Sequence, residues 1–315
     1  MPPHEGLARL SQNIGIMSQG QLDMTAHPAG AVVPATEEWQ AVDRGVLDFC
    51  AGGASYMASD VRFGTAYSQL PAGMPPIPNL IFHRNQGADI MNKWFDIRGF
   101  NIYDIPGGGF HGLPEIWIWT NTPINSAADL NGLKMRASGD AGEVLAQMGV
   151  GPVFLPLGEV FEAMQRGVID AFEVAAPNFD YMMGMHEAAD YAYLSPSRAP
   201  TEAYGFLVNT SSWEALPDHL KAIVTEAARS EAITYNSIAV ARDGVALQAI
   251  IDYGVNVAPL PSDIDDIFVE LTKEFYAEQV QIYPELAEYL EAYLAFASAW
   301  DELYGFAYPV MTSLD

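Results

Sequence analysis

Two stretches decide the fold class of this chain: residues 41–48, AVDRGVLD, and residues 163–170, AMQRGVID. They share an opening alanine, an Arg-Gly-Val run and a final aspartate, and a leucine in the first stretch faces an isoleucine in the second. Each predicts a helix that ends at a glycine, Gly45 or Gly167, and a short apolar strand that follows it. Because such units build parallel sheets, two distant copies predict two similarly wound α/β lobes. The alternative is that an α/β protein simply reuses glycine to end its helices.

The elements around these stretches extend the same pattern. Near the first copy we expect a helix over 5–18, a strand over 21–26, a helix that Thr36 caps and Gly45 ends, and a strand over 46–50. Near the second copy we expect a strand over 153–155, a helix over 159–166 and a strand over 168–172. The last third predicts three helices, over 216–243, 263–281 and 284–303.

The last two of these helices carry an aromatic-rich stripe. Its members are Tyr276, Tyr283, Tyr289, Tyr293, Phe296, Trp300, Tyr304 and Phe306. We interpret the stripe as core packing or a subunit contact and not as a surface on which a ligand stacks.

The charge balance restricts the classes of partner. The chain has 315 residues, and its 40 acidic and 14 basic side chains give a formal net charge of -26. Such a charge repels phosphate backbones and anionic lipid heads, so we expect no nucleic-acid binding. Any site for an anion must therefore supply its own positive charge or a metal ion.

Cysteine content and hydropathy exclude further kinds of structure. The single Cys50 excludes an intrachain disulfide and a cysteine-based zinc site. The chain has no uninterrupted run of 18 apolar residues, so the sequence predicts no membrane-spanning helix. Residues 1–9 lack the charged and apolar regions of a signal peptide, so we expect that the leader of an exported form has been removed or was never included.

Arg136 is the strongest candidate for an anion anchor. Residues 131–136, NGLKMR, end a polar loop and enter a short apolar strand, which places Arg136 near a sheet edge. A guanidinium there can bind a carboxylate with two parallel hydrogen bonds. A surface salt bridge is the alternative, and local features do not separate the two.

Two acids occupy unusual positions. Glu173 follows the apolar strand over 168–172 and precedes Pro177, which places it at the carboxyl end of a strand, where α/β proteins bind ligands. Glu115 is flanked by a proline and by Trp117 and Trp119. An acid in either place requires a basic partner or a cation, and hard cations favour such oxygen ligands.

Signatures of catalysis are few. The chain has no nucleophile-elbow, zinc-protease or phosphate-loop motif. His111 can be read as a general base, but we favour a structural histidine beside the glycine run at 107–109. The rival class is a metal-dependent lyase or hydrolase that uses Glu115 and Glu173 as an acid-base pair. A third class is an acidic interaction protein with a vestigial cleft.

In the identity of several short motifs and in their order along the sequence, the chain resembles the solute-binding proteins of tripartite ATP-independent periplasmic (TRAP) transporters, of the DctP type. The matching stretches are 18–22, 28–30, 41–48, 123–124, 129–136, 149–150 and positions within 156–170, and the resemblance extends to about residue 209. It implies a periplasmic-binding-protein-like fold of two α/β lobes around a ligand cleft, with long C-terminal helices. It also implies a periplasmic or other extracytoplasmic location, a small organic carboxylate as ligand, transporter membrane subunits as partners, and a monomer or homodimer.

The resemblance assigns roles to individual residues. The family's arginine at the position of Arg136 pairs with the ligand carboxylate. Residues 170–177, DAFEVAAP, are similar to a run in the branch that binds 2-oxo and 2-hydroxy acids, where the glutamate and the next carbonyl hold a metal ion. Carried over, Glu173 and the Val174 carbonyl become ligands of Ca²⁺ or Na⁺. The substrate-binding residues that we expect are Arg136, Glu115, Tyr56, Trp119, Glu173 and Asn178.

The chain departs from that branch in three places. Val174 stands where the branch usually has tryptophan, which opens space for a ligand longer than pyruvate. Glu115 aligns with a glutamine that completes the metal site, so we expect a preference for Ca²⁺ over Na⁺. We expect that the family's first strand and leader have been trimmed from this chain or lost through a misplaced start, and without that strand the first lobe would expose backbone edges. We expect residues 1–122 mainly in lobe one, 123–209 mainly in lobe two, and 210–315 as a helical region that crosses back between them.

Overall fold

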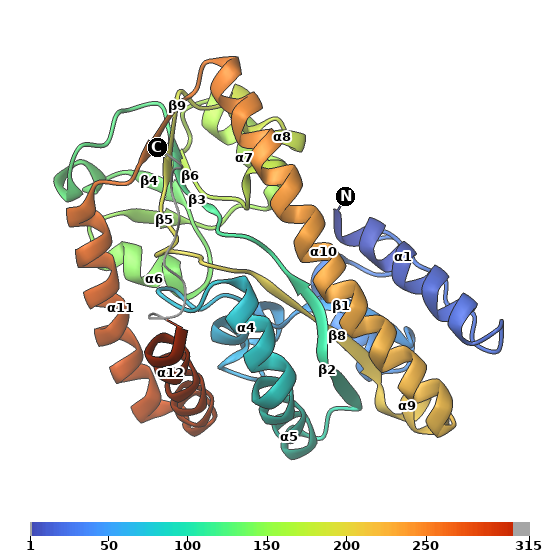
Figure 1. The fold of residues 1–315 in the computed structure, drawn as a ribbon. Helices are drawn as coiled ribbons and strands as arrows, with labels where there is room; N and C mark the ends of the chain where they lie inside the picture. Colours follow the sequence, from blue (N-terminus) through green and yellow to red (C-terminus); the bar gives the residue numbers. More distant parts are fainter. Residues whose placement is uncertain (1, 305–315) are drawn as a thin grey trace.

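The computed structural model describes residues 2–304, which form two β-sheets with helices packed around them (Figure 1). The smaller sheet has the antiparallel order β1-β8-β2, with β1 at Phe49–Gly53, β8 at Ala203–Asn209 and β2 at Ile102–His111. The larger sheet has the order β5-β4-β6-β3-β7-β9. Its strands are β5 (Gly151–Val153), β4 (Lys134–Arg136), β6 (Ala171–Phe172), β3 (Ile116–Thr120), β7 (Tyr191–Leu194) and β9 (Asn256–Pro259). Two α/β lobes, as predicted, are confirmed.

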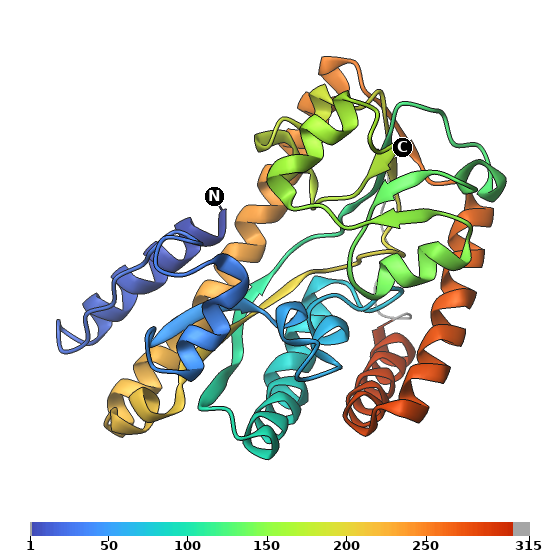
Figure 2. The ribbon, with the colours of Figure 1, turned by 180° about the vertical axis from the view of Figure 1, so that it is seen from behind.

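The helices cover both sheets and link them. They are α1 (Pro2–Met17), α2 (Glu38–Asp43), α3 (Gly64–Ser68), α4 (Pro76–Phe82), α5 (Ala88–Arg98), α6 (Gly139–Gln147), α7 (Leu157–Gln165), α8 (Pro177–Met182), α9 (Thr210–Ala215), α10 (Asp218–Tyr253), α11 (Ser262–Ile282) and α12 (Pro284–Tyr304). The long helix α10 runs from one lobe to the other, with α1 beside it (Figures 1 and 2). The predicted C-terminal helices are therefore confirmed, and α11 and α12 brace one side of the molecule (Figure 1).

The chain passes between the sheets at three points. It leaves the smaller sheet after β2 and enters the larger one at β3, returns between β7 and β8, and crosses again through α10 to β9. The strand β3 falls within the residues expected mainly in lobe one but belongs to the larger sheet. The strand β8 falls within the residues expected mainly in lobe two but belongs to the smaller sheet. The division at residues 122 and 209 stays a prediction for where each lobe begins.

The sequence repeat corresponds to a repeated turn. Gly45 and Gly167 have φ angles of 69° and 68°, a left-handed conformation that favours glycine. In the first copy the N–H of Val46 donates to the carbonyl of Ala41 over 2.8 Å. In the second, the N–H of the residue after Gly167 donates to the equivalent alanine carbonyl over 2.9 Å. Both helices thus end with the same backbone geometry before a strand begins.

Several predicted boundaries are wrong. The strands expected at 46–50 and 168–172 begin only at Phe49 and Ala171, and Val46 is 59% exposed. The reason is that the turn after each glycine still directs two N–H groups back to the preceding helix, so those residues cannot join a sheet. Thr36 lies in a short 3₁₀ turn and caps no helix by its side chain. The first lobe's described sheet has no parallel pair of strands.

The strand expected at residues 21–26 is also wrong, because this segment has irregular backbone. Leu22 and Met24 still pack, partly buried, against the apolar cluster that includes Leu10 and Ile14 of α1, so the alternation of apolar side chains follows the face that packs inward. A strand also needs neighbouring backbone groups to pair with, and the described residues offer this segment none. Sequence alternation cannot supply that neighbour.

Three members of the aromatic stripe pack in the core, as the sequence predicted. Tyr276, Tyr289 and Tyr293 have at most 8% of their surface exposed and join the largest apolar cluster. Phe306 lies outside the described residues. Among residues 2–304, none of the helices is both long and apolar enough to cross a membrane.

Candidate functional site

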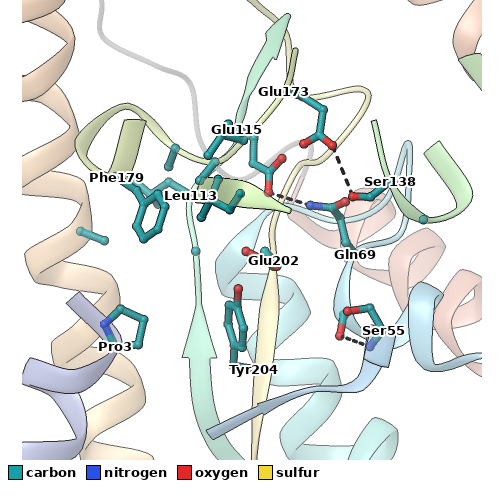
Figure 3. Close-up of a pocket in the computed structure, with 18 of the residues that line it drawn as sticks. Pro3, Ser55, Gln69, Leu113, Glu115, Ser138, Glu173, Phe179, Glu202 and Tyr204 are labelled. Carbon is teal, nitrogen blue, oxygen red and sulfur yellow. Dashed lines mark hydrogen bonds between the residues drawn. The ribbon is translucent and has the colours of Figure 1, made fainter. Parts of the chain in front are cut away.

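A cavity of about 600 Å³ lies where the chain crosses between the two sheets. Its walls come from both sides: β4 and the segment after β6 belong to the larger sheet, while Glu202 and Tyr204 lie at the start of β8 in the smaller one. Figure 3 shows Glu115 and Glu173 close together, with Gln69 and Ser138 beside them. The cavity therefore gathers polar groups from segments that are distant in sequence.

The structure brings most of the predicted site residues to this cavity. Arg136, Glu115, Glu173, Asn178, Tyr56 and the metal candidate Val174 all line it. Trp119 does not, and this prediction needs correction. Its side chain is fully buried and its indole N–H donates to Asp180 over 2.7 Å. The alternation of β3 turns Trp119 into the core of the larger lobe, away from the cavity.

Arg136 is held in place by the segment after β6. Its Nη1 donates to the Glu173 carbonyl over 2.7 Å and to the Glu173 carboxylate over 2.8 Å. Its Nε donates to the carbonyl of Leu155 over 3.4 Å. Among the described residues, nothing accepts a hydrogen bond from Nη2 of Arg136. One face of a cavity-lining guanidinium is thus available to an acceptor that enters the cavity.

A second arginine, which the sequence did not single out, lies behind the two acids. Arg198 is 1% exposed. Its Nη2 donates to Glu115 over 2.7 Å, and its Nη1 donates to Glu173 over 3.2 Å. The remaining donors reach the carbonyls of Ile116 and Trp117. The only sequence signal was an arginine, one of few basic residues, within the serine and proline segment that joins two apolar strands.

Burial dominates the electrostatics of the acids. It raises the pKa of Glu115, and the positive charge of Arg198 opposes this shift. Burial also raises the pKa of Glu202 to about 7, and a hydrogen bond from Tyr204 opposes that shift. Both oxygens of Glu115 accept from N–H donors, one on Arg198 and one on Gln69 at 2.7 Å. This geometry is built for the ionised form of Glu115.

The cavity has more acids than bases: it is lined by Glu5, Glu115, Asp140, Glu173, Glu202 and Asp243, and by Arg9, Arg136 and Arg242. In the cluster around the candidate metal ligands, Glu115, Glu173 and Glu202 carry three negative charges when ionised, against two positive charges on Arg136 and Arg198, a difference of one. A bound monocarboxylate increases the deficit to two. Such a site attracts cations or protons.

The donor set fits a hard metal ion that is completed by a ligand. Two carboxylates, of Glu115 and Glu173, lie at the cavity, and oxygen is the donor that Ca²⁺ and Na⁺ prefer. Within residues 2–304, no group of three or more His, Cys, Asp or Glu side chains could hold a metal. The protein side chains therefore form part of a coordination shell, and backbone carbonyl and ligand oxygens would provide the rest.

His111 has a structural role. Its ring is buried, and its Nδ1 lies 3.3 Å from the amide nitrogen of Asn79. Burial lowers its pKa to about 3, so it is neutral at ordinary pH. It does not line the cavity. This agrees with the structural interpretation that we favoured from the sequence.

Comparison with known proteins finds one matching protein family and several related proteins. The model of the bacterial extracellular solute-binding proteins, family 7 (DctP), matches residues 1–282. A monocarboxylate 2-oxoacid-binding periplasmic protein of Nostoc is 26% identical, over 96% of this chain and 83% of the relative. The C4-dicarboxylate-binding periplasmic protein DctP of Rhodobacter capsulatus is 26% identical, over 92% and 84%.

Solved structures agree with these relatives. A TRAP periplasmic solute-binding protein of Colwellia psychrerythraea, with bound calcium and pyruvate, superposes with a TM-score of 0.87 at 27% identity, over 96% of this chain and 93% of that one. A corresponding protein of Pseudoalteromonas atlantica, with bound sodium and pyruvate, gives 0.85 at 26% identity, over 96% and 92%.

Proposed function

This chain belongs to the DctP family of bacterial extracellular solute-binding proteins, family 7, and on that premise we propose that it captures a 2-oxo or 2-hydroxy monocarboxylate for a TRAP transporter. The partners are the small carboxylate and the membrane subunits of that transporter. Proteins of this family bind solutes for transport, and the chain is not an enzyme. The acid-base pair of the rival hypothesis, Glu115 and Glu173, is bridged by Arg198 instead.

The observation that carries this proposal is the arrangement of Arg136. One side of its guanidinium is fixed by Glu173, and its Nη2 has no acceptor among the described residues. A ligand carboxylate that enters the cavity can accept from this nitrogen and share the positive charge. In a protein with a net charge of -26, such a local cation is what an anionic ligand requires.

A metal ion at this site would be held by Glu173, Glu115 and the Val174 carbonyl. Ca²⁺ or Na⁺, when bound, would supply a positive charge that offsets the carboxylates of the protein and of the ligand. Relatives from Colwellia and Pseudoalteromonas hold calcium or sodium together with pyruvate. The negative charge difference in the cavity supports the same arrangement in this chain.

The shape of the cavity supports a ligand with more carbon atoms than pyruvate. Beside the acids, the walls are apolar at Leu113, Val174 and Phe179. The volume of about 600 Å³ lies within the range of pockets that enclose molecules of drug size. We infer that the side chain of an aliphatic or aromatic 2-oxo acid lies against this apolar wall.

The family model describes extracellular proteins, which supports a location outside the cytoplasm, and we propose the periplasm for this chain. Delivery to membrane subunits requires that the ligand be released unchanged. The expectation of a monomer or homodimer remains a prediction.

Thermal unfolding with a panel of 2-oxo acids tests this function. Pyruvate, 4-methyl-2-oxopentanoate and phenylpyruvate are each added with CaCl₂, with NaCl, or after chelator treatment. A ligand at 100 times its Kd stabilises the folded protein by about 2.7 kcal/mol, which raises the melting temperature. We expect stabilisation that depends on both the acid and the cation, and recovery of the unchanged acid after denaturation. No stabilisation by any 2-oxo acid, or turnover of the acid, would contradict the proposal.

A further inference from the structure

Arg198 is the feature of the cleft that the proposed function leaves unexplained. The side chains of Glu115 and Arg198 are 3% and 1% exposed and form an ion pair at 2.7 Å. Arg198 also reaches Glu173, whose side chain is 4% exposed, at 3.2 Å. A buried guanidinium is therefore fixed between the two carboxylates that would hold a metal ion. Its other donors are bound by backbone carbonyls, so it has no freedom to swing into the cavity.

A fixed positive charge at this position changes what an incoming ion experiences. With Arg198 present, the charges of Glu115 and Arg198 cancel, and Arg136 pairs with Glu173, so these four side chains together carry no net charge. Without Arg198, Arg136 alone would offset two carboxylates, and the ion would face a net negative charge. The interaction energy is proportional to the charge of the ion, so a divalent cation is affected twice as strongly as a monovalent one.

We propose that Arg198 sets the ion preference of the cleft: by cancelling the charge of Glu115, it keeps Na⁺ competitive with Ca²⁺. This inference rests on the proposed function, since it concerns the cation that accompanies the carboxylate ligand. It also revises the expectation from sequence that a second carboxylate favours a divalent ion. The carboxylate is present, but its charge is already matched by a residue 83 positions further along the chain.

Four full-length proteins form a charge cycle that tests the proposal: wild type, Arg198→Gln, Glu115→Gln, and the double variant. Calorimetry measures the apparent affinities for Ca²⁺ and for Na⁺ at saturating pyruvate, after removal of bound ions with a chelator. We expect Arg198→Gln to raise the ratio of Ca²⁺ to Na⁺ affinity by about tenfold or more, and Glu115→Gln to lower it by a similar factor. The double variant carries the wild-type net charge and should return the ratio to within about threefold of the wild type.

The cycle remains decisive if one variant does not fold. Arg198→Gln leaves two buried acids with one counter-charge, so circular dichroism is recorded for each protein. If that variant is unfolded, Glu115→Gln and the double variant decide, because they differ only at Arg198, and the double variant should have the higher ratio of Ca²⁺ to Na⁺ affinity. Equal ratios in all folded variants, with pyruvate binding intact, would overturn the role of Arg198. No cation-dependent binding of any 2-oxo acid by the wild type would overturn the proposed function, and this inference with it.

Discussion

Arg136 and Arg198 both donate to Glu173, but their surroundings give them different roles. Arg198 is almost fully buried, and every nitrogen of its guanidinium has an acceptor in the protein. The Arg136 side chain is 12% exposed and lines the cavity with one nitrogen available. A buried guanidinium in which every nitrogen has a protein acceptor organises its neighbours, whereas a partly exposed one can exchange a protein partner for a ligand.

Substituting Arg136 should therefore affect binding of the acid directly. We expect Arg136→Ala to weaken binding of the preferred 2-oxo acid by about 2 to 5 kcal/mol, because truncation leaves the ligand carboxylate without its counter-charge. Titration calorimetry measures this. Arg166→Ala is the control, since the Arg166 side chain is 74% exposed and, among residues 2–304, pairs with Glu162 alone. Unchanged affinity in Arg136→Ala would remove the anchor assignment.

Asp104 in β2 is another buried acid, and it does not line the cavity. It is 1% exposed and accepts a hydrogen bond from the Tyr67 hydroxyl, while its Oδ1 has no partner among the described residues. Burial raises its pKa from 3.8 to about 7. The folded protein thus retains a proton on Asp104 over a pH range in which the unfolded chain has released it.

This shift predicts a pH dependence of stability with a definite sign. Between about pH 4 and pH 7 the folded state binds more protons at Asp104, so its contribution to the free energy of unfolding falls as pH rises, by up to about 4 kcal/mol. Asp104→Asn cannot ionise and lacks this slope. Urea denaturation of both proteins at several pH values should show the variant gaining stability relative to wild type as pH rises. The buried His83 and His111 affect both proteins alike, and a constant difference would refute the assignment.

Among the secondary-structure elements, α2 and α7 end in the same way, at Gly45 and at Gly167. Both have a left-handed φ, and each is followed by a strand. A Cβ atom added to Gly167 would meet no atom within 4 Å, so only the backbone conformation requires glycine there. The turn thus depends on one residue's conformational freedom.

Two substitutions at α7 separate this requirement from a general effect of glycine. Gly167→Ala should lower the free energy of unfolding by about 1 to 2 kcal/mol, the cost of a left-handed alanine. Gly158→Ala is the matched control: it lies in the same helix, has an ordinary φ and equally open surroundings, and should stabilise the protein by up to about 1 kcal/mol. Chemical denaturation measures both. Equal effects of the two substitutions would contradict the conformational explanation.

At the scale of the whole molecule, Asp140 at the start of α6 ties three regions together. It accepts hydrogen bonds from Arg62 at 3.1 Å, from Thr65 in α3 at 2.7 Å, and from Tyr276 in α11 at 2.8 Å. The aspartate is 5% exposed. The lobe that carries Arg136, the opposite lobe and the C-terminal brace therefore meet at one carboxylate.

Removing this carboxylate should weaken the whole fold. We expect Asp140→Ala to lower the free energy of unfolding by about 3 kcal/mol or more, because it removes the carboxylate that pairs with Arg62 and leaves two hydroxyl groups without their acceptor. Glu143→Ala, an exposed position on the same helix, should change it by less than about 0.5 kcal/mol. Urea denaturation followed by circular dichroism compares them. Similar stabilities of the two variants would show that the contact does not hold the regions together.

Features that depend on neighbours a few residues away can be predicted from the amino-acid sequence alone. The glycine turns, the C-terminal helices and the position of Arg136 at the end of β4 all follow local periodicity and backbone preference. Glu173 was correctly expected at the end of its strand for the same reason. With the family resemblance, these features predicted two lobes and a carboxylate anchor.

The tertiary structure is needed to show which residues that are distant in the sequence lie next to one another. Arg198 is 25 positions from Glu173 and 83 from Glu115, and no local pattern reports that the crossing between β7 and β8 brings it to both. The direction of Trp119 depends on the register of β3 with its neighbours, and residues 21–26 required a pairing partner to become a strand. Electrostatic pairing and strand pairing act through space, so the order of the strands decides them.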